Sequence, residues 1–328
     1  MKHFLLVCKM KNSATFKNQF YTQFPIECQP IWGIQESYVF LGSCFSTNIS
    51  NLFEQHFVSS YSNPFGTQFS PDAIEKTLHH ISSQTIPEIS VFNNRFYALL
   101  FDSHFSHDNK QILQANIENK LQESLKQIES ATTMFITLGS AWVYRYLESQ
   151  SLVGNCHKIP QKHFEKTLLK INEIEQNLIQ TVQHIRKINA TCKIIFTVSP
   201  VRHLRNGITE NTISKAHLIA SLNKFIQQNS TCHYFPSFEI FNEELRDHRF
   251  FESDLAHPNQ TAISYIFQRL IETYGTSQFL EYIEVANLLR SKMMHKVKST
   301  NEDDIQKWQE KLDLEISNFK QQYPNCCL

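Results

Sequence analysis

The sequence predicts an α/β protein in which helices cover both faces of a central, mostly parallel sheet. Short apolar, β-prone runs alternate along the chain with helical stretches of about 12 residues or more, a pattern typical of parallel sheets. Gly42, Gly139 and Ser199 each follow one of these runs. Because sites in such sheets form at the carboxyl ends of the strands, we expect the three turns to meet at one edge.

The expected strands are short buried runs that end at glycine or polar residues. They cover residues 38–41, 132–138, 193–198 and 233–235. Two hairpins are also expected, at 91–101 around Asn93-Asn94 and at 144–154. The helices show apolar residues at helical spacing, and Ser46 or Thr47 is expected to cap the first of them. They cover residues 47–56, 71–80, 109–130, 173–189, 214–228 and 260–274, followed by one or two peripheral helices in 278–322.

Composition narrows the class of protein. At 328 residues, the chain has room for one α/β domain with additions. Basic and acidic residues are equal at 31 each, so no basic field indicates a nucleic-acid partner. The 15 histidines form no HExxH motif and the 8 cysteines no paired CxxC, so neither a metal nor a cofactor is expected. Nor do the cysteines resemble a disulfide framework in a chain this long.

The N-terminus begins with a short apolar stretch that Lys9 and Lys11 interrupt. A signal peptide has an uninterrupted apolar segment of roughly 7–15 residues, so we predict a cytoplasmic protein. No apolar run approaches the roughly 18 residues of a membrane span.

The turn Gly42-Ser43-Cys44-Phe45 is the first candidate for chemistry. A nucleophile at a strand-to-helix turn lies beside unpaired N–H groups and the positive end of the helix dipole. These groups stabilise an oxyanion and lower the pKa of a thiol. The alternative is an ordinary strand-end glycine followed by helix-capping residues.

Asp254 and His257 are the second candidate, three residues apart just before a predicted helix. In a loop, the carboxylate of Asp254 can accept the imidazole N–H and fix the tautomer of His257. The other ring nitrogen then serves as a general base toward a serine or cysteine. The alternative is a turn-forming aspartate beside a surface histidine, with His257-Pro258-Asn259 opening the helix.

Together these motifs resemble the GSCFA-domain family, a bacterial group placed near the SGNH/GDSL hydrolases. The resemblance rests on the block at 38–46 and on further ordered segments, and it covers roughly residues 20–275. Those segments are Asn63-Pro-Phe-Gly66, Leu138-Gly-Ser-Ala-Trp-Val-Tyr144, Asn155-Cys-His-Lys158, Val198-Ser-Pro-Val-Arg-His203, Glu244-Leu-Arg-Asp247 and Asp254-Leu-Ala-His257-Pro258. It implies a three-layer αβα sandwich of SGNH-hydrolase type with peripheral C-terminal helices. The expected parts are an N-terminal extension (1–20), the α/β domain (21–275) and a C-terminal helical extension (276–328).

The resemblance also assigns roles to single positions. Aligned on Gly42, the nucleophile position of the SGNH pattern falls on Cys44, with Ser43 as second candidate. The final Asp-x-x-His block is intact at Asp254 and His257. Gly66 takes the place of the second-block oxyanion donor. In the third block, Gly139-Ser140-Ala141 lacks the family's asparagine, a donor whose loss typically costs about 2.7–4 kcal/mol of barrier. Ser140, Asn155 or His157 are the candidate substitutes.

Two functions follow from these assignments. The first is a hydrolase or acyltransferase, an SGNH-type esterase that acts on a small acyl ester, on a carbohydrate or a lipid-like alcohol. Lys158, Arg202 and His203, with Asn155 and His157, are its candidate substrate-binding residues. The alternative is a non-catalytic ligand-binding protein on a degenerate SGNH scaffold. A redox or structural role for Cys44 lacks a partner cysteine in a CxxC motif, and the oligomeric state is left open.

Overall fold

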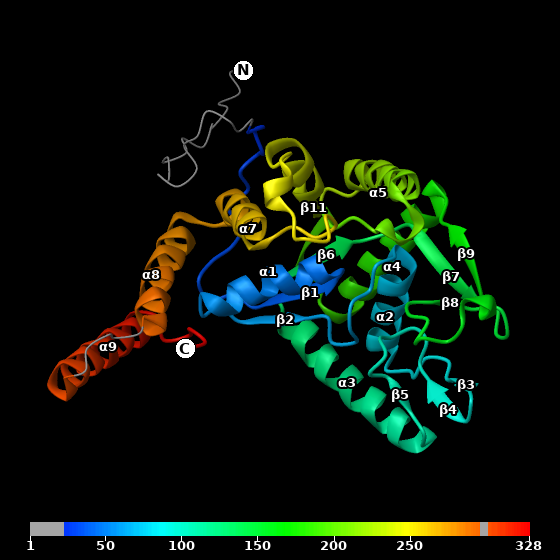
Figure 1. Cartoon of the computed structure of the whole chain (residues 1–328), viewed down its shortest axis with the longest axis horizontal. Coiled ribbons are helices and arrows are strands. Elements are labelled where there is room, and N and C mark those ends of the chain that lie inside the picture. Colours follow the sequence, from blue (N-terminus) through cyan, green and yellow to red (C-terminus); the bar gives the residue numbers. More distant parts are fainter. Residues whose placement is uncertain (1–22, 296–300) are drawn as a thin grey trace.

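The computed structural model describes residues 23–295 and 301–328 (Figure 1). Its centre is a five-stranded sheet with the order β11-β10-β6-β1-β2, and every neighbouring pair in it is parallel. The sheet aligns Gly42, at the end of β1, with Thr137 of β6, and Thr137 with Thr197 of β10. Its strands are β1 (Tyr38–Gly42), β2 (Ser60–Ser62), β6 (Thr133–Leu138), β10 (Lys193–Val198) and β11 (Cys232–Phe235).

Helices cover both faces of this sheet, which makes the fold a three-layer αβα sandwich, as predicted. Successive side chains of β1 alternate between the layers: Tyr38 and Phe40 face one core, and Val39 and Leu41 the other. The first core is covered by α1 (Cys44–Gln55), α7 (Gln260–Tyr274) and α8 (Ser277–Met294). The second is covered by α2 (Pro71–Ser83), α3 (Lys110–Ser130), α4 (Ile171–Ile188) and α5 (Ile208–Gln228).

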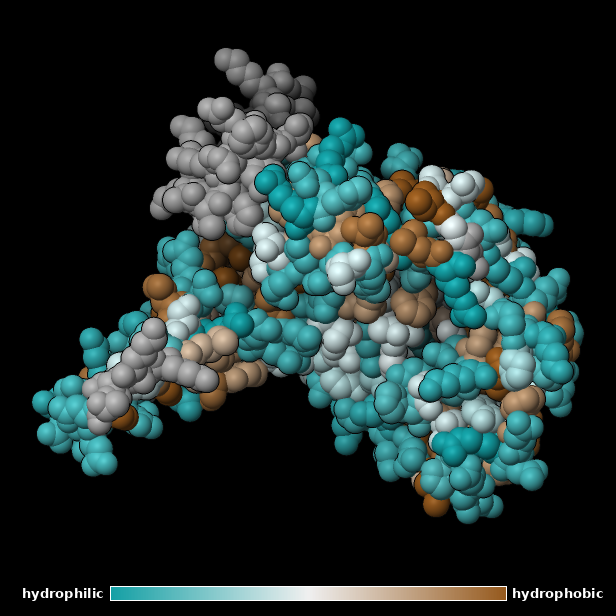
Figure 2. Space-filling view, viewed as in Figure 1, coloured by the Kyte–Doolittle hydropathy of each residue, from teal (hydrophilic) through white to brown (hydrophobic). Residues whose placement is uncertain are grey.

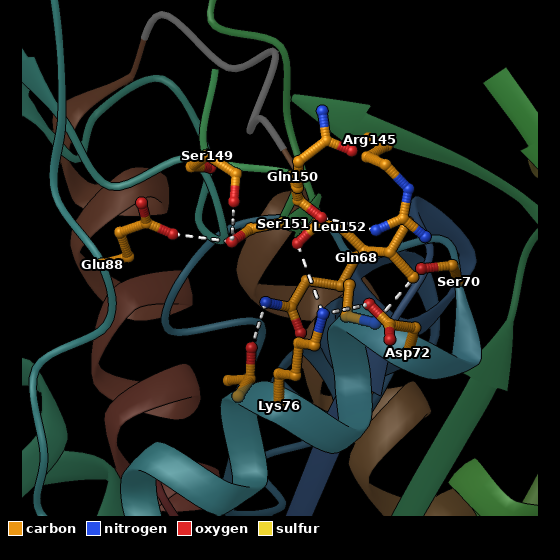
Figure 3. A network of polar contacts seen from close by, with 12 residues as sticks. Gln68, Ser70, Asp72, Lys76, Glu88, Arg145, Ser149, Gln150, Ser151 and Leu152 are labelled. Atoms are coloured by element: carbon orange, nitrogen blue, oxygen red, sulfur yellow. Dashed lines mark hydrogen bonds and ion pairs between the residues drawn. The ribbon is translucent and has the colours of Figure 1, made fainter. Parts of the chain in front are cut away.

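Two small antiparallel sheets flank the main one. They comprise β3 (Ser90–Phe92), β4 (Arg95–Tyr97) and β5 (Ser106–His107), and β7 (Trp142–Tyr146), β8 (Leu152–Val153) and β9 (Phe164–Leu168). Polar contacts fasten the β7–β8 hairpin to the body of the protein (Figure 3). Lys76 of α2 donates to the Leu152 carbonyl at 3.4 Å and pairs with Asp72 at 3.0 Å, and Ser151 donates to Glu88 at 2.7 Å. This network braces the start of α2.

The C-terminal helices α8 and α9 (Glu302–Gln322) extend away from the sheet as an arm (Figure 1). The chain then returns to α1, where the Cys327 N–H donates to the Phe57 carbonyl at 2.9 Å and Phe319 packs against Phe57. Short helical turns lie at Gln161–His163, Leu204–Asn206, Ser237–Glu239, Ile240–Glu244 and His248–Phe250. Among the described helices, none is long and apolar enough to cross a membrane.

The predicted strands, hairpins and helices are present with small shifts of their ends. The first cap was wrong: α1 begins at Cys44 with Ser43 as its cap, because Ser46 is buried and donates to the Leu41 carbonyl and to Thr137. The strands β2, β5 and β9 were missed, and α5 begins at Ile208 rather than at residue 214. The predicted N-terminal extension, 1–20, lies outside the described residues.

Replacing Gly42 with alanine is expected to destabilise the fold by more than about 3 kcal/mol, because a clash adds to backbone strain. Gly42 has a φ of +123°, and a Cβ there would lie 2.1 Å from the Thr137 carbonyl oxygen. Gly207 is the matched control, because its φ is +93° but a Cβ there would meet no described atom within 4 Å. Its alanine variant is expected to lose about 1–3 kcal/mol from strain alone. Urea unfolding measures the stability of both variants. Equal losses of stability would contradict the predicted clash at residue 42.

Candidate active site

The turn after β1 separates the two candidate nucleophiles. Ser43 is completely buried, and its hydroxyl caps α1 by accepting from the Phe45 N–H at 3.3 Å. Cys44 is only half-buried and is the first residue of α1. Burial raises the pKa of the Cys44 thiol, while hydrogen bonds from the N–H groups of Cys44 and Phe45 and the charge of Lys215 lower it in part. Cys44 is therefore the better placed of the two to meet a substrate.

Asn63 holds this turn, although the sequence analysis assigned it no role in the site. Its side-chain oxygen accepts from the Gly42 N–H at 2.8 Å, and its amide donates to Thr47 at 2.9 Å. Asn63 itself has a left-handed φ of 42°, a conformation that asparagine tolerates well. The signal in the sequence was the turn at Asn63-Pro64. The Asn63 side chain links this loop after β2 to the end of β1.

Asp254 and His257 form the predicted pair. Their side chains approach to 2.6 Å between Asp254 Oδ2 and His257 Nδ1. The other carboxylate oxygen of Asp254 accepts from the N–H groups of Ala256 and His257 at 2.9 and 3.0 Å, which holds Leu255 at a strained φ of 56°. These bonds lower the pKa of Asp254 to about 2, so it is ionised at neutral pH. The carboxylate fixes the imidazole with Nδ1 as donor and leaves Nε2 for chemistry.

Packing brings this pair to the same edge of the sheet as Cys44. The Arg202 N–H, just past β10, donates to the Ala256 carbonyl at 3.0 Å. Phe267 of α7 packs against Phe53 of α1, with ring centroids 5.5 Å apart, so the helices that follow His257 and begin at Cys44 lie side by side. Among the described residues, no hydrogen bond joins His257 to Cys44 or Ser43; contacts of this kind are often looser without substrate.

Arg202 and His203 also lie at this edge. The Arg202 guanidinium stacks on the Phe251 ring at 4.2 Å, beside the Asp254–His257 loop. The His203 ring meets Phe69 edge-on at 5.0 Å, and its buried Nε2 has no hydrogen-bond partner within the described chain. Burial, with the charges of Lys215 and His257, lowers the pKa of His203 to about 3. His203 is therefore neutral at neutral pH.

The N–H groups of the predicted oxyanion donors Gly66, Gly139 and Ser140 already donate hydrogen bonds within the fold. The N–H of Gly66 donates to the Asn63 carbonyl, and those of Gly139 and Ser140 both donate to the Phe69 carbonyl, each at 2.8 Å. The Ser140 hydroxyl accepts from the Trp142 N–H at 3.0 Å. The groups that face the thiol are instead the N–H groups of Cys44 and Phe45.

Asn155, His157 and Lys158 lie in a loop against the small sheets. The Asn155 N–H donates to the Leu99 carbonyl at 3.0 Å, and the buried His157 ring bonds to the Phe101 carbonyl at 2.9 Å. No hydrogen bond, ion pair or ring contact in the described ranges joins these residues to Cys44 or His257. Asn155 and His157 thus bond within their own part of the fold.

Lys215 is a residue of the site that the sequence analysis missed. It lies on the buried face of α5 with Leu218 and Leu222, and its Nζ reaches the carboxyl ends of β6 and β10. A lysine at an apolar-face position of an amphipathic helix was the available signal. Across the described residues, no group of three or more histidine, cysteine or acidic side chains could hold a metal ion.

Comparisons with known proteins place the chain in a family. No curated protein matches it. A carbohydrate esterase family 3 structure from Talaromyces cellulolyticus aligns over 77% of this chain and 98% of its own, at 8% identity and a TM-score of 0.35. An acetyl xylan esterase (Est2A) from Butyrivibrio proteoclasticus aligns over 81% of this chain and 66% of its own, at 11% identity and a TM-score of 0.39. Residues 37–270 match the GSCFA family, and the chain belongs to that family.

Proposed function

We propose that this protein is an acyl hydrolase or acyltransferase that uses Cys44 as nucleophile on a small ester. The observation that carries the proposal is the Asp254–His257 pair, held at 2.6 Å at the sheet edge where a half-buried cysteine begins α1. The carboxylate, imidazole and thiol are the components of a covalent acyl-transfer site.

The reaction proceeds in two balanced steps. His257 takes the proton of the Cys44 thiol, the sulfur attacks the ester carbonyl to form a C–S bond, and the tetrahedral intermediate expels the alcohol, which takes that proton from the His257 imidazolium. Water, or a second alcohol in a transfer reaction, then attacks the thioester and gives its proton to His257. The C–S bond breaks, the carboxylic acid or new ester leaves, and the sulfur takes the proton back from His257. Asp254 stabilises the imidazolium in the first step.

The oxyanion is bound by the N–H group of Cys44 at the positive end of α1, because the Phe45 N–H already donates to the Ser43 hydroxyl at 3.3 Å. This group takes the place of the asparagine that the third block lacks. Exposed apolar side chains flank this region: Leu255 next to His257, and Ile208 at the start of α5. Leu255 and Ile208 provide an apolar rim for the acyl group or for a lipid-like alcohol; a carbohydrate alcohol is the other class of substrate. Figure 2 shows hydrophobic residues exposed at several places on the face that it draws.

The absence of a hydrogen bond between His257 and Cys44 in the described residues favours one alternative, a non-catalytic ligand-binding protein on the same scaffold. It predicts binding of an ester ligand without turnover and ordinary reactivity of the Cys44 thiol.

Hydrolysis of a short-chain aryl acetate by the purified protein separates the two functions. We expect His257→Ala to lower kcat/KM by about 10²–10⁴-fold, because it removes the general acid and base. Cys44→Ala is expected to reduce the rate to background. His248→Ala is the matched control, because this exposed histidine lies on a neighbouring turn and packs edge-on against the Phe251 ring. No turnover by the wild-type protein, or equal rates in the wild type and all three variants, would contradict the enzyme proposal.

Ser43 is expected to affect stability rather than turnover. Ser43→Ala removes the cap of α1 and is expected to lower the free energy of unfolding by about 1 kcal/mol, whereas Ser43→Gly costs only a few tenths. Urea unfolding measures the loss of stability. The aryl acetate rate per folded molecule measures the effect on turnover, which we expect to be small. A rate in Ser43→Ala as low as in Cys44→Ala would identify Ser43 as the nucleophile instead.

Asp254→Asn tests how His257 is oriented. An asparagine favours the wrong tautomer of the imidazole, so we expect kcat/KM to fall by up to about 10⁴-fold. Because the pKa of Asp254 is about 2, its carboxylate is ionised over the whole range in which the protein is assayed. The acid side of the wild-type pH–rate profile should therefore show no step from this group. An unchanged rate in Asp254→Asn would exclude the pair from catalysis.

A further inference from the structure

Arg202 carries an unpaired positive charge at the edge of the sheet where the site lies. The residue follows β10 and is half-buried. Its guanidinium lies over the Phe251 ring, 4.2 Å from the ring centroid, and that ring is itself buried against Phe241, with centroids 4.6 Å apart. In the described chain, no hydrogen bond or ion pair engages the guanidinium N–H groups. The stacking therefore holds a cation in place without neutralising it.

Two contacts place this guanidinium beside the loop that carries Asp254 and His257. The Arg202 N–H donates to the Ala256 carbonyl, inside that loop, at 3.0 Å. Phe251, on which the guanidinium lies, forms an antiparallel bridge with the residue that follows His257. The cation is thus fixed from its own main chain and from its stacking partner, next to the proposed general base.

The acidic residues around this loop leave Arg202 without a partner. The Asp254 carboxylate is bonded to the imidazole of the pair, and Asp247 forms its ion pair with Arg249, at 3.9 Å. Glu252 is exposed and forms no ion pair with Arg202 within the described residues. Partial burial lowers the pKa of Arg202, and no acidic neighbour offsets this effect. Because a guanidinium stays charged throughout the physiological range, the loop presents an uncompensated positive charge.

We propose that Arg202 binds a carboxylate of the substrate, so that the substrate class is an ester with a negative charge near the bond that is cleaved. A guanidinium offers a carboxylate two parallel N–H groups, and a single cation matches a single negative charge. His203, the next residue, is neutral at neutral pH and adds no charge. The inference rests on the proposed function for the reaction, but binding of the anion is measurable without turnover.

The test compares two anionic esters with their neutral methyl esters. Mono-4-nitrophenyl adipate carries its charge in the acyl part, and 4-acetoxybenzoate carries it in the alcohol part. In Arg202→Met, which removes the charge, we expect kcat/KM to fall by about 10–100-fold for the anionic member of one pair. The rates on both neutral methyl esters should change little, which also shows that the variant folds. The pair that responds identifies the part of the ester that bears the carboxylate.

Arg249→Met is the matched control. Arg249 lies two residues before Phe251 and its guanidinium also faces an aromatic ring, that of Phe250 at 5.0 Å, but it pairs with a carboxylate. Its loss removes the same charge from a neighbouring turn and should not lower the rate on either anionic ester selectively. Arg202→Lys keeps the charge without the planar fork, so it should retain part of the rate on the anionic ester that Arg202→Met loses.

Binding measurements keep this inference apart from the proposed function. The same four compounds are titrated by ligand-observed NMR against Cys44→Ala, which lacks the proposed nucleophile. The anionic member of one pair should bind about tenfold or more tightly than its methyl ester, and adding Arg202→Met should remove the difference.

The inference is overturned if neither anionic compound binds better than its methyl ester, or if Arg202→Met weakens the neutral and anionic compounds alike. Equal selective losses in Arg249→Met and Arg202→Met would also overturn it, because they would show attraction by the general charge of the surface. A protein that turns over no ester but binds the anionic compound through Arg202 would retain the carboxylate site and lose only its catalytic use.

Discussion

The close contact between the backbones of Gly42 and Thr137 is the constraint on which the site depends. Because a Cβ at residue 42 would lie 2.1 Å from the Thr137 carbonyl oxygen, only glycine lets β1 end this close to β6. The chain then turns at a φ that favours glycine, Ser43 becomes the cap of α1, and Cys44 becomes its first residue. The Asn63 side chain holds the same turn from the loop after β2. The thiol is thus placed by main-chain packing.

The edge of the sheet beside this turn is polar although it is buried. Ser46 bonds to Thr137, Thr197 bonds to Ser237, and Lys215 bonds to the carbonyls that follow β6 and β10. Buried polar groups cost free energy unless they are hydrogen-bonded, and these groups are. Side chains held in this way keep their geometry when substrate binds, which is what stabilisation of a developing charge requires. The N–H groups of Gly139 and Ser140 are likewise hydrogen-bonded, to the Phe69 carbonyl, and so serve the fold rather than an oxyanion.

Periodicity and local motifs predicted the sheet, most helices and the Asp254–His257 pair, because each depends on residues near one another in sequence. The buried strands read as apolar runs, and a carboxylate three residues before a histidine closes a tight turn by itself. The role of Ser43 was not readable, since a capping serine and a nucleophilic serine look alike until burial is known. Lys215 was missed because its partners, the Gly139 and Ser199 carbonyls, are main-chain groups that carry no sequence signal.

The sulfur of Cys44 suits a site in which the histidine does not touch the nucleophile. A serine hydroxyl ionises so weakly that it needs a base within hydrogen-bond reach, whereas a thiol is several units more acidic and responds to nearby positive charge. At residue 44 that charge comes from the N–H groups at the start of α1 and from Lys215, and it offsets in part the burial that raises the pKa of the thiol. His257, fixed by Asp254, takes the thiol proton once substrate brings the groups together, and then protonates the leaving alcohol and activates water. The nucleophile is thus assisted from the sheet side, and the proton transfers occur on the solvent side. The proposed mechanism therefore needs no hydrogen bond between His257 and Cys44 before substrate binds.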